Sequence, residues 1–177
     1  MPLSVVKTIR DLIFWQYAKM ISESSGFGKN NYGFMMDRYK KLKNEEISWS
    51  SSIREYLKEK ECPNACAYCG SKKKLTLEHI LLRSRGGPDI SENAVMVCKS
   101  CNSSKGSKRL YEWLGLVGRD SGHRIAGGKY LKLIYSLHEK NKTLGKGPLC
   151  NKCDMEEKCP VKGELSVYCL EGCFGNG

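Results

Sequence analysis

The sequence contains neither a hydrophobic run long enough to cross a membrane nor a segment typical of a secretory signal. Its uninterrupted apolar stretches, such as residues 12–15, are only a few residues long, whereas a membrane-spanning helix needs roughly 20. The N-terminus lacks a basic segment followed by an apolar core and a cleavage site of small residues. Internal repeats and low-complexity tracts are absent as well. We therefore expect a cytoplasmic protein that has no membrane partner.

Acidic residues are scarce relative to basic ones, whereas cysteine is abundant. The 177 residues include 30 Lys and Arg against 19 Asp and Glu, which gives a formal net charge of +11. Residues 63–110 carry nine of the basic and three of the acidic side chains. Such a charge favours a polyanionic partner, and ten cysteines in a chain without a signal segment favour bound metal over disulfides. Together these features predict a metal-stabilised protein that binds nucleic acid.

Hydrophobic periodicity predicts helices on both sides of a cysteine-rich centre. Apolar residues recur at spacings of three and four over residues 3–22, 33–43, 49–60 and 129–140. A helix that opens at Asn102 is expected to continue through Leu114, and the glycine-containing stretch 119–128 is expected to form a solvated basic loop.

The fold expected from these elements is α+β, in four consecutive segments. They are a helical subdomain (1–61), a central core (62–114), a basic loop with a helix and linker (115–148), and a cysteine-rich tail (149–177). The helical subdomain shows no chemistry of its own, so functional residues are sought in the centre and in the tail.

Two C-x2-C turns, 66–69 and 98–101, frame the centre of the chain. A turn of this kind directs two thiolates at one tetrahedral ion, so two turns complete a four-cysteine site. Zinc is the expected metal because it is redox-silent and favours thiolates in this geometry. Four protein ligands close such a site, which predicts a structural ion held by Cys66, Cys69, Cys98 and Cys101.

Between these turns the pattern predicts a ββα unit with a second, oxygen-lined metal site. Residues 74–80 alternate as a strand that ends near Glu78 and His79, and residues 94–97 suit a returning strand. Glu78 would end one strand where Asn102 opens the following helix, so their side-chain oxygens can converge on one cation. Oxygen ligands favour Mg²⁺ or Mn²⁺ over zinc.

The order of these residues resembles the HNH endonuclease family over about residues 63–109. The resemblance is carried by Glu78-His79, a Gly86-Gly87 loop, Asn93, and the run Cys98-x2-Cys101-Asn102-x2-Lys105-Gly106. Three positions depart from the commoner pattern: residue 78 is Glu rather than Asp, residue 102 is Asn rather than His, and Leu82 stands where proline is frequent. None of these departures removes a functional group.

The resemblance implies roles for individual residues. Histidine, with an ordinary pKa of about 6.5, suits a general base, so His79 would activate water while Glu78 and Asn102 hold the catalytic cation. Asn93 would brace the loop and orient the backbone at His79. Lys105 would lie near the scissile phosphate. Further phosphate contacts are expected from Arg83, Arg85, Lys108 and Arg109.

A second group of cysteines lies in the tail, at Cys150, Cys153, Cys159, Cys169 and Cys173. Four of them could hold a second zinc ion, which would staple a segment too short to fold by itself. An iron–sulfur cluster is the alternative, because four thiolates also suit one and Pro160 directly follows Cys159. The spacing matches neither ferredoxin pattern, which favours zinc, and disulfides are the third choice.

The function predicted from these features is hydrolysis of DNA, most readily double-stranded DNA, by a metal-dependent HNH endonuclease. The alternative is a non-catalytic, zinc-stabilised module that binds nucleic acid. That module would need no Glu-His pair at a strand end, so Glu78 and His79 favour the enzyme. With one active site per chain, cutting both strands would require a homodimer or two sequential nicks. His123 and His138 are expected to be structural.

Overall fold

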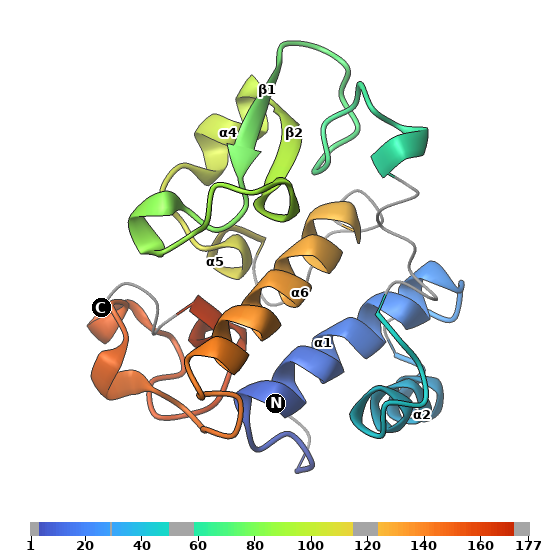
Figure 1. Ribbon diagram of the computed structural model, residues 1–177, viewed down its shortest axis with the longest axis vertical. Helices are drawn as coiled ribbons and strands as arrows, with labels where there is room; N and C mark the ends of the chain where they lie inside the picture. Colours follow the sequence, from blue (N-terminus) through green and yellow to red (C-terminus); the bar gives the residue numbers. More distant parts are fainter. Residues whose placement is uncertain (1–3, 29, 50–58, 115–123, 172–177) are drawn as a thin grey trace.

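The structure is a computed structural model that describes residues 4–28, 30–49, 59–114 and 124–171 (Figure 1). In chain order its helices and strands are α1 (Ile9–Ser24), α2 (Tyr32–Lys43), β1 (Leu75–His79), β2 (Ala94–Cys98), α4 (Lys99–Lys105), α5 (Leu110–Leu114) and α6 (Arg124–Lys140). Short 3-10 turns lie between the strands and in the tail. Helices with one two-stranded sheet make this the α+β fold predicted from the sequence.

The sheet and α4 form one end of the molecule, and α1 and α2 form the other (Figure 1). Helix α6 lies between the two ends, where it contacts α1 and the turn Ser91–Asn93 that precedes β2. The tail turn Val167–Glu171 contacts α1 and also α5. The tail therefore reaches both the helical end and the sheet end of the fold.

Helix α1 begins at Ile9, six residues later than hydrophobic periodicity predicts. The cause is a capping box, in which the Thr8 hydroxyl accepts from Asp11 N while the Asp11 carboxylate accepts from Thr8 N. The same buried carboxylate accepts hydrogen bonds from Tyr39 and Lys43 of α2. One side chain thus fixes the start of α1 and ties it to the next helix.

Helix α6 begins earlier than predicted, at Arg124, although its glycines indicated a loop over residues 119–128. Close packing explains the difference, since a Cβ on Gly127 would lie 3.1 Å from the terminal methyl of Met20 on α1. Glycine lets the two helices approach, so it serves contact rather than chain reversal here. Residues 115–123 and 50–58, which include most of another expected helix, lie outside the described residues.

The two strands and the helices that follow them form the predicted ββα arrangement with one interruption. Strands β1 and β2 are antiparallel, with Leu75 opposite Cys98 and His79 opposite Ala94. We call the two C-x2-C turns, 66–69 and 98–101, the knuckles. The helix after β2 starts within the second knuckle and ends before Gly106, which takes a φ of 52°. A positive φ suits glycine, so the continuous helix expected from residue 102 to 114 is instead two helices, α4 and α5.

One continuous hydrophobic core joins these elements. It includes Ile13 and Tyr17 of α1, Val97 of β2, Ile134 of α6 and Leu170 of the tail. All four segments proposed from the sequence contribute residues to this one core. Among the described residues, no helix has the length and apolar character needed to span a membrane.

Candidate active site and cysteine knuckles

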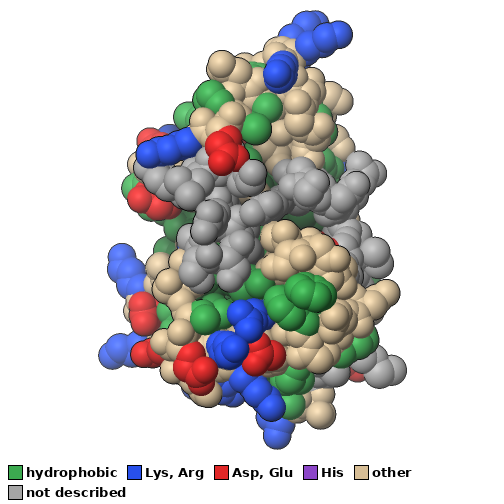
Figure 2. All heavy atoms as spheres, turned by 90° about the vertical axis from the view of Figure 1, so that its right-hand side faces the viewer, with side chains coloured by type: hydrophobic (Ala, Val, Ile, Leu, Met, Phe, Trp, Pro, Cys, Tyr) green, Lys and Arg blue, Asp and Glu red, His purple; other side chains and the backbone are tan. Residues whose placement is uncertain are grey.

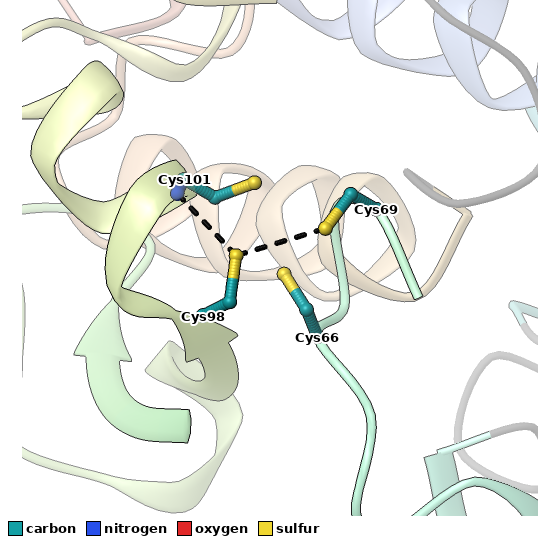
Figure 3. Close-up of side chains that lie close together, drawn as sticks. All are labelled: Cys66, Cys69, Cys98 and Cys101. Atoms are coloured by element: carbon teal, nitrogen blue, oxygen red, sulfur yellow. Dashed lines mark hydrogen bonds between the residues drawn. The ribbon is translucent and has the colours of Figure 1, made fainter. Parts of the chain in front are cut away.

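Four cysteine sulfurs converge at the end of the sheet (Figure 3). Cys66 and Cys69 come from the loop before β1, Cys98 ends β2, and Cys101 lies in the first turn of α4. The four sulfurs lie within 4.8 Å of one another, and Cys69 Sγ is 3.7 Å from Cys98 Sγ. Zn–S bonds of about 2.3 Å in a tetrahedron place sulfurs about 3.8 Å apart. The predicted cysteine cluster is therefore present and could bind zinc.

A hydrogen bond from a backbone N–H group fixes each of the two knuckles. Ala67 N donates to Met96 O at 2.8 Å, which joins the first knuckle to β2, and Cys101 N donates to Cys98 Sγ at 3.4 Å. This second hydrogen bond is the main cause that lowers the pKa of the Cys98 thiol to about 7. Because the thiolate is the form that binds metal, the local backbone favours ligation at this position.

Glu78 lies on the inner face of β1, with its side chain 6% exposed. Its Oε1 accepts a hydrogen bond of 2.8 Å from Nζ of Lys105, which lies on α4 and is fully buried. Its Oε2 has no hydrogen-bond partner among the residues that the structure describes. Burial, followed by the charge of Glu78 and by a side-chain hydrogen bond with it, raises the pKa of the nearby Tyr68 well above its usual value. Lys105 thus engages only one of the two oxygens of the carboxylate.

His79, the next residue, is partly exposed, as expected when successive side chains of a strand alternate between faces. Its Nε2 lies 2.9 Å from Asp89 Oδ1, and Nη1 of Arg83 lies 3.9 Å from Asp89 Oδ2. The hydrogen bond with His79, followed by the charge of Arg83, lowers the pKa of Asp89. An ionised carboxylate only accepts hydrogen bonds, so His79 Nε2 carries the proton, and in neutral imidazole Nδ1 carries the lone pair.

Asn93 is fully buried and braces the chain directly after His79. Its Oδ1 accepts from Leu81 N at 2.8 Å, and its Nδ2 donates to Leu81 O at 2.8 Å and to Pro88 O at 2.9 Å. The Asn93 carbonyl accepts from Ile80 N at 2.8 Å. Three of these hydrogen bonds engage the Asn93 side-chain amide with backbone atoms, and the fourth uses its backbone carbonyl.

Gly87 lies where the same loop folds back on the chain after β1. A Cβ at this position would lie 2.0 Å from the Leu81 carbonyl oxygen, closer than any real contact. Gly87 N also donates to Leu82 O at 3.0 Å. The loop that carries Asp89 therefore needs glycine at this point.

Asn102 lies one turn before Lys105 on α4 and is half-buried. Residues three apart lie on one helix face, so Asn102 shares the face from which Lys105 reaches Glu78. The fold therefore brings Lys105 of α4 to Glu78 of β1, which is next to His79 in the sequence, and Asn102 lies on the same face of α4 as Lys105.

With this geometry established, comparison with known proteins identifies the segment. Residues 66–111 match the family described as HNH endonuclease. Residues 66–111 are therefore similar to HNH endonucleases, and we call them the HNH segment. The "SPbeta prophage-derived putative HNH endonuclease YoqL" of Bacillus subtilis (strain 168) is 32% identical over 95 residues, which are 47% of this chain and 38% of that protein. The chain thus matches well under half the length of this relative. No solved structure matches the chain significantly.

Sequence reasoning did not single out Asp89, the residue in the HNH segment that contacts His79. The two residues are ten positions apart. The hydrogen bonds that shape the loop between them come from Gly87 and Asn93, and no recognised motif includes Asp89. A signal was nevertheless present, since the aspartate directly follows the Gly86-Gly87-Pro88 turn that was expected to form the loop.

The basic residues expected to contact phosphate lie in different environments of the HNH segment. Arg83 and Lys108 are exposed, and Arg85 is half-buried. Lys105 is fully buried and Arg109 is 2% exposed, because both are paired with protein groups. In this conformation those two side chains are directed at the protein and not at a phosphate, unlike the expectation from the sequence.

The remaining sequence predictions concern the tail and two histidines. Four of the five tail cysteines line one small cavity, whereas Cys173 lies outside the described residues, as does His123. His138 is fully buried on α6, with its Nε2 at 2.9 Å from Leu170 O and its Nδ1 at 2.7 Å from Thr143 Oγ1. Its contacts join α6 to the tail, which is a structural placement.

Proposed function

We propose that this protein is a metal-dependent endonuclease that hydrolyses DNA phosphodiester bonds, with His79 as the general base. The observation that carries the proposal is the hydrogen bond between His79 and Asp89 at the end of β1, inside the HNH segment. A histidine held by a carboxylate, with its second nitrogen free of that bond, is arranged to take up a proton.

The contact with Asp89 defines how His79 would act. Nδ1 would take a proton from water as the water oxygen bonds to phosphorus and the bond between phosphorus and the 3′-oxygen breaks. The imidazolium that forms would be stabilised through Nε2 by the ionised Asp89. The departing 3′-oxygen would take a proton from solvent water, so the products would carry a 3′-hydroxyl and a 5′-phosphate. Asp89 acts through His79 and is a positioning residue.

Glu78 and Asn102 would hold the catalytic cation. The donor set supports this assignment, since Glu78 Oε2 lacks a hydrogen-bond partner among the described residues and Asn102 adds an amide oxygen on the facing helix. Such oxygens suit Mg²⁺ or Mn²⁺. When bound, the cation would supply charge stabilisation at the phosphate and the leaving oxygen. Lys105, which now neutralises Glu78, would compete with it for the carboxylate.

Charge supports a nucleic-acid substrate. Three consecutive lysines, Lys72, Lys73 and Lys74, are exposed just before β1, and Arg83 and Lys108 are exposed further along the same segment. On the face shown in Figure 2, by contrast, the described basic and acidic side chains of the lower half are interspersed. The DNA would therefore be contacted at the sheet end, where backbone phosphates pair with lysine and arginine without reading sequence.

The proposal is tested by nicking of supercoiled plasmid. Zinc-loaded protein should convert the plasmid to open-circle or linear DNA when Mg²⁺ or Mn²⁺ is added, and not when both are omitted. Omission of both cations is preferable to adding a chelator, because a chelator would also remove metal from the cysteine site. Plasmid that is retarded in a gel but stays uncut with either cation would favour the zinc-stabilised binding module instead. The ratio of linear to open-circle product would report on paired cutting by a homodimer.

The role of Asp89 has a separate test. Asp89→Asn keeps a hydrogen-bond acceptor for His79 but removes the charge that stabilises the imidazolium. We expect slower nicking and an acid limb of the pH–rate profile that moves to lower pH. Glu92→Gln, an exposed change in the same loop, is the matched control and should leave the profile unchanged. A profile that does not move in Asp89→Asn would remove Asp89 from the mechanism.

A further inference from the structure

Four cysteines of the tail surround one small cavity. They are Cys150, Cys153, Cys159 and Cys169. They belong to a part of the chain that has no α-helix and no strand among its described residues, 149–171, and only short 3-10 turns of three to five residues. A segment of isolated turns has few backbone hydrogen bonds, and small segments of this kind often depend on a cross-link or a metal.

Hydrogen-bond donors approach three of these sulfurs. Gly163 N donates to Cys150 Sγ at 3.4 Å, and Ser166 N donates to Cys169 Sγ at 3.4 Å. The guanidinium of Arg109 donates to Cys153 Sγ through both of its terminal nitrogens, at 3.5 and 3.6 Å. Donors aimed at sulfur are the outer hydrogen bonds that thiolate ligands of metals receive, and they orient the ligand and offset its negative charge.

We propose that Cys150, Cys153, Cys159 and Cys169 hold a second metal centre as thiolates. The chemical class of the centre is a soft metal bound by sulfur, which is a zinc ion or an iron–sulfur cluster. All four ligands are contributed by described residues, so the centre does not need Cys173. The proposal is independent of the nuclease activity, because none of its four ligands belongs to the candidate active site.

The two cysteine groups differ in how closely their sulfurs approach. Among the described residues, only the knuckle sulfurs gather within 4.8 Å of one another, whereas the tail sulfurs line the walls of a cavity. A single zinc ion would have to draw the tail sulfurs inward. An iron–sulfur cluster, which places irons and sulfides between its ligands, would fill a wider space. The two metals therefore make different predictions for composition and colour.

The centre would fix a link between the tail and the HNH segment. Asp154, next to Cys153, forms an ion pair of 2.7 Å with Arg85 and a second ion pair with Arg109. Arg109 also donates to Tyr168 O at 2.6 Å, and it directly precedes α5. Arg85 lies in the loop between His79 and Asp89. Metal bound at the cysteines would thereby hold Asp154 in place and steady the loop that carries Asp89, the partner of the candidate base.

The first test is to count metals in the wild-type chain. The protein would be purified without oxygen and then analysed for zinc, iron and acid-labile sulfide, before and after reconstitution with zinc or with iron and sulfide. A second zinc per chain, or one zinc together with an iron–sulfur cluster absorbing in the visible range, is the expected result. One zinc and no bound iron under every condition would overturn the proposal.

Cysteine variants assign the second centre to the tail. Cys159→Ser should lose that centre and keep the knuckle zinc, whereas Cys62→Ser should keep both, because Cys62 is exposed and belongs to neither group. Retention of both centres by Cys159→Ser would contradict the assignment. If Cys159→Ser is insoluble, Cys150→Ser serves the same purpose. None of these measurements uses DNA, so a failed nuclease assay leaves the outcome intact.

The proposed link has its own test. Asp154→Ala removes the ion pairs with Arg85 and Arg109 but none of the proposed metal ligands. We therefore expect the metal content to stay the same and the loop at residues 83–89 to exchange its amide hydrogens faster. Glu157→Ala is the matched control, because Glu157 is an exposed carboxylate of the same tail that pairs only with Lys162 among the described residues. Unchanged exchange at the loop in Asp154→Ala would overturn the link while leaving the metal centre in place.

Discussion

The two cysteine groups of this chain stabilise their surroundings in different ways. The knuckle cysteines lie at the ends of secondary-structure elements that already hydrogen-bond to one another, and their sulfurs converge. The tail cysteines lie among short turns, line a cavity, and connect to the rest of the protein through charged side chains. One group therefore shapes the candidate site directly, and the other acts on it from outside.

This difference indicates which substitutions should impair folding and which should impair only function. Strand β1 carries Glu78 and His79, β2 ends in Cys98, and α4 carries Cys101 and Asn102, so a metal at the knuckles would fix β2 and α4 around the strand that carries the candidate base. The tail reaches the site through Asp154 and its two arginines. We therefore expect damage at the knuckles to abolish folding and damage in the tail to weaken function in a fold that survives.

The largest expected effect comes from breaking the knuckle cluster. Cys98→Ser should eliminate the cooperative melting of the HNH segment, because structural zinc contributes about 10–16 kcal/mol of binding free energy in zinc-finger peptides. Circular dichroism melts and zinc content measure the change. Cys150→Ser is the tail counterpart and should retain the melt of the HNH segment. A normal melt with full zinc in Cys98→Ser would contradict the comparison.

The next largest effect concerns the buried ion pair between Lys105 and Glu78 in the HNH segment. Lys105→Met leaves the Glu78 carboxylate buried without its cation, and removal of one partner of a buried ion pair destabilises by about 3–5 kcal/mol. Urea unfolding measures the loss, and Lys108→Met, at an exposed position, should change stability by less than about 0.5 kcal/mol.

Added Mg²⁺ or Mn²⁺ sharpens this experiment. If Glu78 is a cation ligand, the divalent ion should stabilise Lys105→Met more than it stabilises the wild type, because the variant offers the carboxylate without competition. Equal stabilisation of both proteins would argue against Glu78 as a ligand.

A smaller effect is expected at Gly87, where the loop after β1 packs against the backbone of Leu81. Gly87→Ala would push a methyl group into the Leu81 carbonyl, and forced overpacking destabilises by about 1–3 kcal/mol. Because this loop carries Asp89, nicking should fall as well. Gly145→Ala is the control, since a methyl group there meets nothing within 4 Å. Equal stability and activity of the two variants would show that the loop adapts freely.

The smallest effect is a pH dependence on the tail side. Burial lowers the pKa of His138, which holds α6 against Leu170 of the tail. The folded state therefore binds this proton less readily than the unfolded chain, and stability should fall as the pH drops below about 6.5, with a slope of at most about 1.4 kcal/mol per unit. Urea midpoints at several pH values measure the slope. His138→Gln should flatten it, and an unchanged slope would exclude His138 as its source.

What could be predicted from the sequence was mostly local. The ββα unit and the cysteine knuckles follow from alternation and from C-x2-C spacing, which are features of a few consecutive residues. The start of α1 was also encoded locally, in the capping box of Thr8 and Asp11, although apolar periodicity alone placed it too early. The early start of α6 was not, because Gly127 is explained by Met20 on another helix.

The candidate site was harder to predict where distant segments meet. Lys105 pairs with Glu78 across 27 positions, and Arg109 pairs with Asp154 across 45. Both basic residues looked like phosphate contacts in a motif, and the fold instead supplied each with a buried carboxylate or tail partner. Charge patterns in sequence do not distinguish a cation that faces solvent from one that neutralises an acidic group brought close by packing.

The most direct measurement is the single-turnover nicking rate of the wild type and of His79→Ala, at saturating protein with Mg²⁺, beside the DNA affinity of both. The account predicts a fall in rate of at least about 10²-fold in the variant, with unchanged affinity and unchanged melting, since a general base contributes roughly 10²–10⁴-fold. Equal nicking rates in the two proteins would contradict the account, because the base would then lie elsewhere.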